Sequence, residues 1–159
     1  HIVDLLTLQE SEQYRGEEKK LLVGSIRKTI IIHTASIIEA MLLWKLRQYC
    51  KSEKVEMDDE WKYFDIRTLY KVNESEEIIA GNRKKEKIDM NRLDFLKITL
   101  LCRKYKIVNT EELKKEIDAV RNLRNRLHIG SLEEIEKEYS KKDLEFCFSI
   151  AKKVKEIVG

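Results

Sequence analysis

Proline is absent from the 159-residue chain, and glycine occurs only five times. Few positions therefore interrupt a helix, because proline and glycine are the residues that most disfavour helix interiors. The three cysteines lack metal-ligand spacing and are expected to be small apolar residues in a reducing compartment: Cys50, Cys102 and Cys147. The sequence contains no glycine-rich phosphate loop, nucleophilic triad pattern or metal-ligand cluster. We therefore expect neither a metal nor another cofactor.

The chain also lacks a long unbroken apolar run and a strong net charge. Its most apolar stretch, residues 29 to 44, is interrupted by His33, Ser36 and Glu39 and is short for a membrane span. We expect no membrane helix and a cytoplasmic protein. The net charge is only +3, from 32 basic and 29 acidic residues, which does not by itself indicate nucleic acid. The chain begins with His1 rather than Met, so we expect a piece of a longer protein.

Helical periodicity covers most of the chain. Residues 2 to 20 predict a leading helix, and residues 21 to 50 predict a central buried helix because they are apolar nearly all round. Asn91 is a suitable N-cap for a further helix, Asn109 with Glu112 has the capping-box pattern at the start of the next, and Ser140 is a suitable N-cap for the last one. The predicted fold class is all-α: an antiparallel helical bundle that forms a single domain over residues 1 to 159.

Residues 53 to 88 break this periodicity and are expected to form an insertion between helices. Four residues alternate along an extended segment: Phe64, Ile66, Thr68 and Tyr70. A turn pattern follows at residues 73 to 76, and a second extended run begins at Ile78. These features predict a small β-hairpin at about residues 60 to 88. A loop with a short helix is the alternative.

The helix expected from about residue 110 to residue 129 carries the most informative pattern. At about 100° per residue its apolar residues form one stripe: Leu113, Ile117, Val120, Leu123 and Leu127. Arg124 falls inside this stripe, and Arg121, Asn125 and His128 share its edge. An internal salt bridge would explain one arginine in a core-facing stripe. Two arginines, an amide and a histidine together also suit phosphate binding and proton transfer.

Residues 121 to 128, Arg-Asn-Leu-Arg-Asn-Arg-Leu-His, resemble the Arg-x4–6-His signature of the HEPN superfamily. Residues 34 to 40, where Glu39 interrupts an apolar run, resemble the first core helix of these domains. The resemblance implies a homodimer that brings two motif helices together and cleaves RNA without a metal. It also implies a toxin–antitoxin or defence role, in which an antitoxin protein is a further partner.

The resemblance also implies roles for the motif residues. His128 would be the general acid or base, Arg121 and Arg124 would stabilise charge on the scissile phosphate, and Asn125 would orient His128 or the phosphate. Arg121 has the family's spacing to His128, whereas Arg124 with Asn125 resembles the family's Arg-Asn pair, so either arginine can be the catalytic one. Cleavage would leave 2′,3′-cyclic phosphate ends. The alternative function is a non-catalytic dimerisation or nucleotide- or RNA-binding module.

Residues outside the motif complete the prediction. Glu39 is expected to support the site by accepting hydrogen bonds from Arg124, or otherwise from Arg121 or His128, because a carboxylate in an apolar helix needs a cationic partner. The candidates for contact with RNA phosphates are basic: Arg83, Lys84, Lys85 and Arg126. The candidates for base stacking are aromatic: Trp61, Tyr63, Phe64 and Tyr70. A solvated charged face and packing of the hairpin against the bundle are the alternatives.

Overall fold

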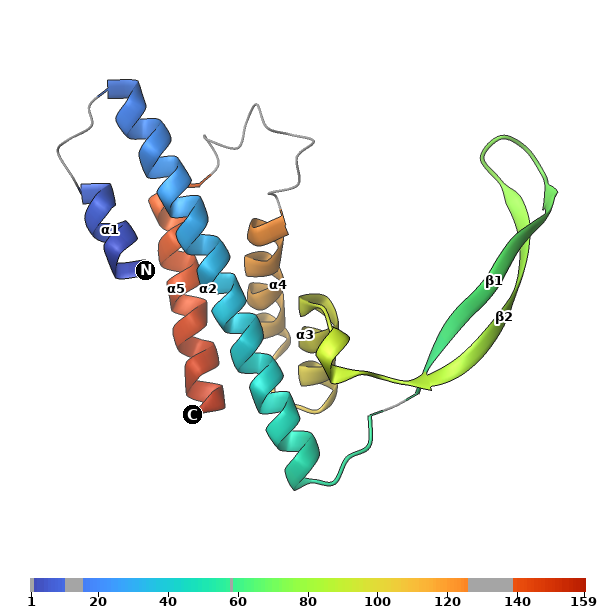
Figure 1. Ribbon diagram of the computed structural model, residues 1–159. Helices are drawn as coiled ribbons and strands as arrows, with labels where there is room; N and C mark the ends of the chain where they lie inside the picture. The colour runs from blue at the N-terminus through green and yellow to red at the C-terminus, as the bar shows by residue number, and fades with distance from the viewer. Residues whose placement is uncertain (1, 11–15, 58, 126–138) are drawn as a thin grey trace. The chain divides into compact units, whose positions relative to one another are not determined.

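The computed structural model describes residues 2 to 10, 16 to 57, 59 to 125 and 139 to 159 (Figure 1). Over these residues it contains five α-helices and one two-stranded antiparallel sheet. The chain is 64% helical and its class is mixed α/β, so the predicted all-α class is wrong. The all-α prediction counts the hairpin as a small addition to the helices, but the two strands of the hairpin have 13 and 11 residues.

The chain divides into two compact units. The first unit joins both ends of the chain, His1–Gln48 and Asp94–Gly159, and holds nearly all of the helical residues. The second unit, Tyr49–Leu93, holds the sheet. The insertion expected at residues 53 to 88 lies inside this second unit.

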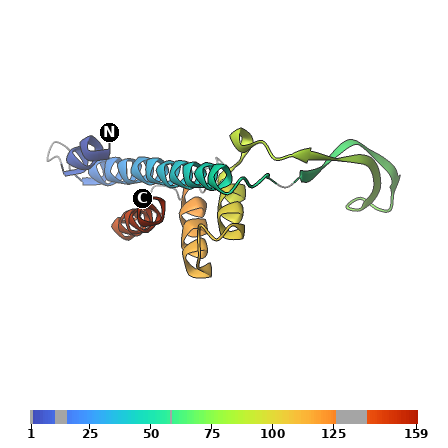
Figure 2. The ribbon, with the colours of Figure 1, turned by 90° about the horizontal axis from the view of Figure 1, so that it is seen from below.

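Five helices follow one another in the order α1 Ile2–Glu10, α2 Gly16–Ser52, α3 Phe95–Lys104, α4 Glu111–Asn125 and α5 Lys141–Val158. A short 3-10 helix, Met90–Arg92, precedes α3. Helix α2 begins at Gly16, inside the stretch predicted as a leading helix, and has 37 residues. Figure 2 shows α3, α4 and α5 on one side of α2.

Helix α2 has one buried and one exposed face. Its buried apolar side chains recur at helical spacing: Ile31, Ala35, Ile38, Leu42 and Leu46. At about 100° per residue, Ile37, Ala40 and Trp44 lie on the opposite side of the helix, where Ile37 is 46% and Trp44 50% exposed. The helix expected to be buried all round is therefore buried along one stripe only.

Among the described helices, one segment is long and apolar enough to cross a membrane by length and composition alone. It spans Leu22–Ser52, and the mean hydropathy of its most apolar window is 1.4. Part of that window is buried against the other helices, and the core helix of a soluble protein has the same length and composition. The expectation of no membrane helix therefore stays a prediction.

The stripes that form the rest of the core match the helical periodicity. Helix α4 buries four residues of the predicted stripe: Leu113, Ile117, Val120 and Leu123. Helix α5 buries a second set: Leu144, Cys147, Ile150 and Val154. Tyr139, just before α5, is also buried, and its hydroxyl donates to the backbone oxygen of Leu123 at 3.2 Å. Burial of such apolar side chains is the main stabilising contribution to the bundle.

The residues that cap the starts of the helices are only partly those that the sequence predicts. Ser140 caps α5 in a capping box, as predicted. Thr110 rather than Asn109 accepts a backbone hydrogen bond in the first turn of α4. Asp94 rather than Asn91 caps α3. Each replacement lies within three residues of the expected cap, because the choice between neighbouring polar residues depends on where the chain turns.

Cys50, Cys102 and Cys147 form no disulfide and are buried, which agrees with the prediction of small apolar residues. Burial raises the pKa of the Cys50 thiol. Burial, with a smaller effect from the charge of Asp143, raises the pKa of Cys147 to about 11. Since the thiolate is the reactive form, we expect Cys147 to resist alkylation at about pH 8 and to react faster as the pH approaches its pKa.

Mass spectrometry after alkylation of the native protein measures this resistance for each cysteine separately. The denatured protein serves as the control and should label at all three positions. Rapid labelling of Cys147 in the native protein at about pH 8 would show that this part of α5 is not packed as described.

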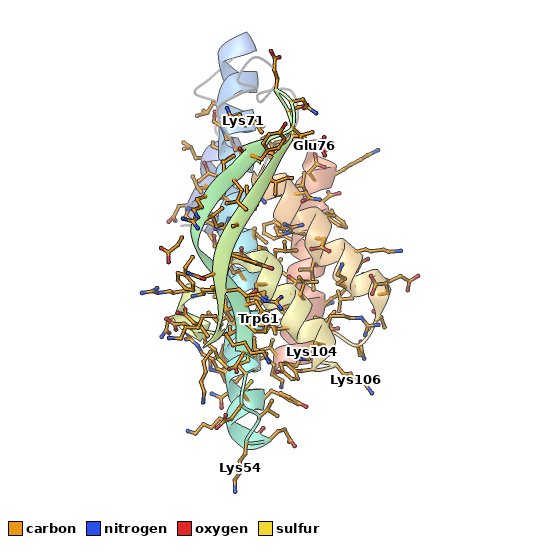
Figure 3. The ribbon with its side chains drawn as sticks, turned by 90° about the vertical axis from the view of Figure 1, so that its right-hand side faces the viewer. Lys54, Trp61, Lys71, Glu76, Lys104 and Lys106 are labelled. Carbon is orange, nitrogen blue, oxygen red and sulfur yellow. The ribbon has the colours of Figure 1, made fainter. Side chains whose placement is uncertain are left out.

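The second unit is built around a β-hairpin of β1, Asp59–Lys71, and β2, Glu77–Lys87. Its strands occupy the region where the sequence predicts a hairpin. Figure 3 shows Lys71 and Glu76 at the turn and Trp61 towards the open end. Nearly all side chains of both strands are exposed, because the sheet has only two strands.

Two irregularities in β1 decide which side chains share a face. The pairing register shifts between Phe64 and Arg67 and again between Thr68 and Tyr70. Asp65, within the first shift, has a φ of 54°, as expected of a bulge. Phe64 and Tyr70 therefore lie on one face and Thr68 on the other. The simple alternation expected from residue 64 to residue 70 is wrong for this reason.

Candidate functional site

Three residues of the predicted motif lie at one pocket of the first unit. Arg121, Arg124 and Asn125 of α4 line a cavity of about 240 Å³. Glu39 of α2 lines it from a second helix. The start of α3 closes it with three further residues: Asp94, Phe95 and Leu96. The pocket therefore joins the polar edge of α4 to the carboxylate predicted to support it.

The predicted pairing of Glu39 with Arg124 is confirmed. Arg124 Nη1 donates a hydrogen bond to Glu39 Oε2 at 2.5 Å. The two side chains remain 33% and 22% exposed. Water reaches the pair, so its contribution is smaller than the roughly 3–5 kcal/mol typical of breaking a fully buried pair. The bond holds the guanidinium of Arg124 at the pocket.

Arg121 is held less completely. Its Nε lies 3.4 Å from Asp118 Oδ1, a distance that fits an ion pair. The angles do not fit a hydrogen bond, and within the described residues neither buried atom has another partner. The other carboxylate oxygen of Asp118 lies 3.0 Å from Lys114 Nζ. Both atoms are inaccessible to solvent, so the charge of Asp118 balances the Nε of Arg121, and a ligand in the pocket would meet the other donors of this guanidinium.

The charges around the pocket are balanced in sign. Two guanidinium groups face two carboxylates, those of Glu39 and Asp94. Asp94 already accepts the backbone N–H of Lys97 at 2.7 Å as the cap of α3. A guanidinium has five N–H donors, so the bond from Arg124 to Glu39 leaves others for a phosphate. The pocket is therefore suited to an anion that binds through the remaining donors of both arginines.

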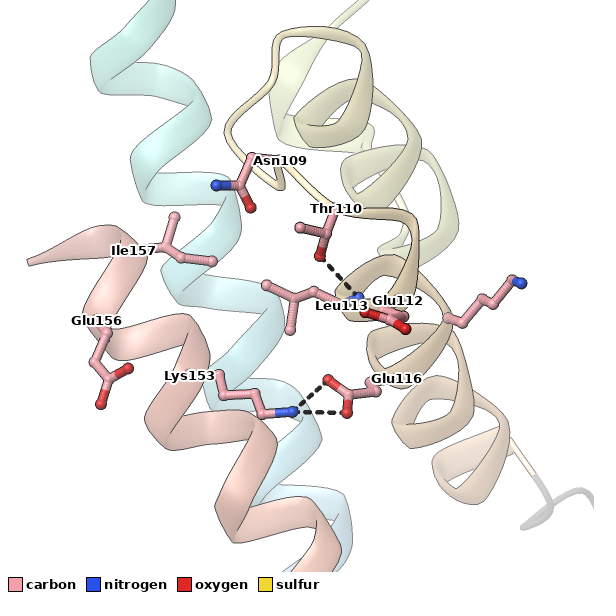
Figure 4. A pocket seen from close by; sticks show the side chains of 9 residues that line it. Asn109, Thr110, Glu112, Leu113, Glu116, Lys153, Glu156 and Ile157 are labelled. Carbon is pink, nitrogen blue, oxygen red and sulfur yellow. Dashed lines mark hydrogen bonds and ion pairs between the residues drawn. The ribbon is translucent and has the colours of Figure 1, made fainter.

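A larger cavity lies elsewhere in the first unit and contains none of the predicted site residues. It has a volume of about 620 Å³ and lies between the start of α4 and the end of α5 (Figure 4). Its central charges already neutralise each other, since Lys153 Nζ donates to the two oxygens of Glu116 at 2.6 and 2.7 Å. Size alone therefore does not identify the site.

No protein-family model, curated protein or solved structure matches this chain. The resemblance to HEPN domains rests on the residues of the sequence alone, and membership of that family stays a prediction.

The remaining predicted residues fall into two groups. Arg126 and His128 lie outside the described residues. Arg83, Lys84 and Lys85 belong to β2 in the second unit, where all three are exposed. They do not line the pocket formed by Arg121, Arg124 and Asn125.

The sequence reasoning missed the contribution of α3 to the pocket. Asp94 is a good N-cap residue directly before the apolar pair Phe95 and Leu96, and this signal was available. The sequence analysis favours Asn91 as the cap instead. A helix that starts at Asp94 places its first turn, rather than a loop, beside the arginines.

The pocket supplies groups that bind an anion and hold its orientation. Two guanidinium groups fit phosphate oxygens, and the Asn125 amide can donate or accept. Among the described residues, no group of three His, Cys, Asp or Glu side chains is arranged to hold a metal ion. Proton transfer near neutral pH would fall to His128, four residues after Arg124 in the sequence.

Proposed function

We propose that the protein is an endoribonuclease that cleaves RNA without a metal and leaves 2′,3′-cyclic phosphate ends. The observation that carries the proposal is the meeting of Arg121, Arg124 and Asn125 at one pocket, where Glu39 holds Arg124. The resemblance of residues 121 to 128 to the HEPN signature supports it. A toxin or defence role, with an antitoxin as partner, is part of the same proposal.

The proposed reaction is an internal transfer of the phosphoryl group. The ribose 2′-oxygen attacks the adjacent phosphorus, and the bond from phosphorus to the 5′-oxygen breaks. His128 takes the proton of the 2′-hydroxyl or gives one to the departing 5′-oxygen, a contribution of about 10²–10⁴ in rate. Arg121 and Arg124 stabilise the charge that develops on the phosphate oxygens.

Glu39 and Asn125 would act through these groups. Glu39 holds Arg124 by a hydrogen bond and is a positioning residue in this mechanism. Asn125, at the end of α4, would orient His128 or the phosphate by hydrogen bonding. Either arginine can be the principal one, since both line the pocket and each has guanidinium donors left for a ligand.

A non-catalytic binding or dimerisation module is the second candidate function. The observation that favours it is the balance of charge at the pocket, where both arginines have a carboxylate within 4 Å. Such pairs also hold helices together without any chemistry. This candidate predicts binding of nucleotide or RNA without turnover.

One experiment separates the two functions. Purified protein is incubated with RNA in EDTA, and the product ends are analysed by their resistance to phosphatase and by mass spectrometry. New cyclic phosphate ends support the nuclease. Intact RNA, together with measurable binding, supports the non-catalytic module.

We also propose a homodimer. The exposed apolar stripe of Ile37, Ala40 and Trp44 on α2 is the surface that a second copy would cover. This stripe faces away from α3, α4 and α5, so a two-fold pair through it differs from the dimer that the resemblance implies, in which the two motif helices meet. We expect Trp44→Glu to convert the dimer to a monomer, because a charge placed in an apolar interface is unfavourable. Sedimentation velocity measures the change.

Trp61→Glu is the matched control, because Trp61 is 45% exposed, close to the 50% of Trp44, and belongs to the second unit. This variant should remain a dimer. A monomeric wild-type protein at high micromolar concentration, or a dimeric Trp44→Glu variant, would contradict the proposed interface.

A further inference from the structure

One face of the β-hairpin places aromatic rings beside cations. We call it the Trp61 face, and it includes four residues at the open end: Trp61, Tyr63, Arg83 and Lys85. Trp61 pairs with Lys85 across the strands, and Tyr63 pairs with Arg83. Arg83 Cζ lies 4.4 Å and Lys85 Nζ 5.3 Å from the centre of the Trp61 ring. These are cation–π distances.

The rings on this face are largely open to solvent. Trp61 is 45% and Tyr63 62% exposed, although both rings would be stabilised by burial. A two-stranded sheet has no further layer of its own to cover them. Exposed aromatic rings that are grouped, rather than scattered, indicate an interaction surface.

The charge of this face differs from that of the opposite one. The Lys62 face, at the same end of the hairpin, has two cations and two carboxylates: Lys62, Lys84, Glu60 and Glu86. Lys62 Nζ lies 2.9 Å from Glu86 Oε2, and the hydrogen bond and charge of Lys62 lower the pKa of Glu86. Charge on the Lys62 face is therefore neutralised within the face, and Lys84, a candidate for phosphate contact from the sequence, does not belong to the surface proposed below.

The Trp61 face at this end has three cations and one carboxylate: Arg83, Lys85, Lys87 and Asp59. Lys87 forms an ion pair with Glu56 at 3.3 Å. Arg83 and Lys85 make no ion pair within the described residues and lie over the Trp61 ring instead. The ring does not cancel their charge, so the face attracts anions.

We propose that the Trp61 face binds single-stranded nucleic acid, with bases stacked on Trp61 and Tyr63 and phosphates held by Arg83 and Lys85. The two rings are two residues apart on one strand, about 7 Å at 3.3 Å per residue, so each can take a different base. Bases stack on aromatic rings and on guanidinium planes. The Arg83–Trp61 pair offers both surfaces.

This binding mode favours one class of nucleic acid. In a duplex the faces of the bases are already stacked, and only phosphates and groove edges remain for the protein. A single strand can offer both bases and phosphates to a face that has both rings and cations. This inference rests on the proposed function only in its choice of RNA as the probe. If the protein is a nuclease, the inference means that its substrate is single-stranded RNA.

Binding is measured without cleavage, in protein that carries His128→Ala. Fluorescence anisotropy of a labelled single-stranded RNA of mixed sequence gives the dissociation constant. We expect Trp61→Ala and Tyr63→Ala each to weaken binding about tenfold or more, the usual effect of losing one stacking ring. The same RNA annealed to its complement should bind more weakly than the single strand.

Two double variants test the face directly with equal changes of charge. Arg83→Gln with Lys85→Gln removes two cations from the Trp61 face. Lys62→Gln with Lys84→Gln removes two from the Lys62 face of the same strands. Only the first should weaken binding and lower the slope of log affinity against log salt, by about 1.4 for two phosphate contacts on a single strand.

The fluorescence of Trp61 gives a readout that leaves the hairpin unchanged. The chain has two tryptophans, so Trp44→Phe leaves Trp61 as the sole indole emitter. Unlabelled single-stranded RNA should quench its emission, because a base stacks on or beside the ring. The reciprocal Trp61→Phe protein, which reports on Trp44, should show no change.

Several results would overturn the proposal. Equal losses in the two double variants would mean that the hairpin attracts RNA by charge alone. Duplex RNA that binds as tightly as the single strand would exclude stacking. A Trp61→Ala variant that binds RNA normally but sediments differently would make the face a protein interface. If RNA binds through Trp61 but is never cleaved, the nuclease proposal fails and this one stands.

Discussion

Substitution of His128 by alanine is expected to abolish RNA cleavage by the protein. His128 is the only residue of the predicted motif that transfers protons readily near neutral pH. Removal of a general acid or base lowers the rate by about 10²–10⁴. Denaturing gel electrophoresis of labelled RNA in EDTA measures the remaining rate, and a cyclic phosphate at the new 3′ end identifies the reaction.

Asn122→Ala is the control for this variant. Asn122 belongs to α4 but is exposed and does not line the pocket, so its loss should leave cleavage unchanged. Equal degradation of RNA by the wild-type protein and by His128→Ala would attribute the activity to a contaminant. The enzyme proposal would then fail, and the binding module would be the better description.

Substitution of Glu39 by alanine is expected to lower both stability and activity. Loss of its hydrogen bond to Arg124 should lower the free energy of unfolding by about 1–2 kcal/mol, since the pair is partly exposed to water. His128→Ala should lower it less. Cleavage should also slow, because Arg124 loses the group that holds it at the pocket. Urea unfolding and initial cleavage rates measure the two effects.

A double-mutant cycle separates the pair from its surroundings. Glu39→Ala, Arg124→Ala and the double variant should give a favourable coupling energy. Arg103 and Glu111, an ion pair at 3.3 Å with side chains 36% and 54% exposed, form the matched surface control and should couple more weakly. A coupling of zero for Glu39 and Arg124 would contradict the supporting role of Glu39.

Glu39 also illustrates what the sequence can predict. A carboxylate in an apolar helix and an arginine in an apolar stripe each need a partner, so the two were expected to meet, and they do. The buried face of α4 was predicted for a similar reason, because one helical period fixes which residues share a face. Such inferences succeed where burial restricts which partners a side chain can have and which face of a helix it can occupy.

The inferences that failed depend on small differences in backbone geometry. Asp94 and Asn91 are both good caps, and tertiary packing decides between them. The register shift at Asp65 moves Thr68 to the opposite face and a second shift returns Tyr70 to the face of Phe64, yet the alternation of these residues in the sequence looks regular. The all-α class is wrong because it counts a hairpin with strands of 13 and 11 residues as a minor addition to the helices. For the site, the predicted pocket residues met, whereas Arg126 and His128 lie outside the described residues.

The bulges in β1 have a consequence for solubility. A two-stranded sheet has two open edges, and each exposes backbone N–H and C=O groups that can pair with the edge of another molecule. A long, flat and partly apolar hairpin would therefore favour aggregation. The kink at Asp65, where φ is 54°, and the cationic sequence of β2 both oppose this pairing. The register shift at Asp65, which makes the simple alternation wrong, therefore also hinders pairing between the strands of separate molecules.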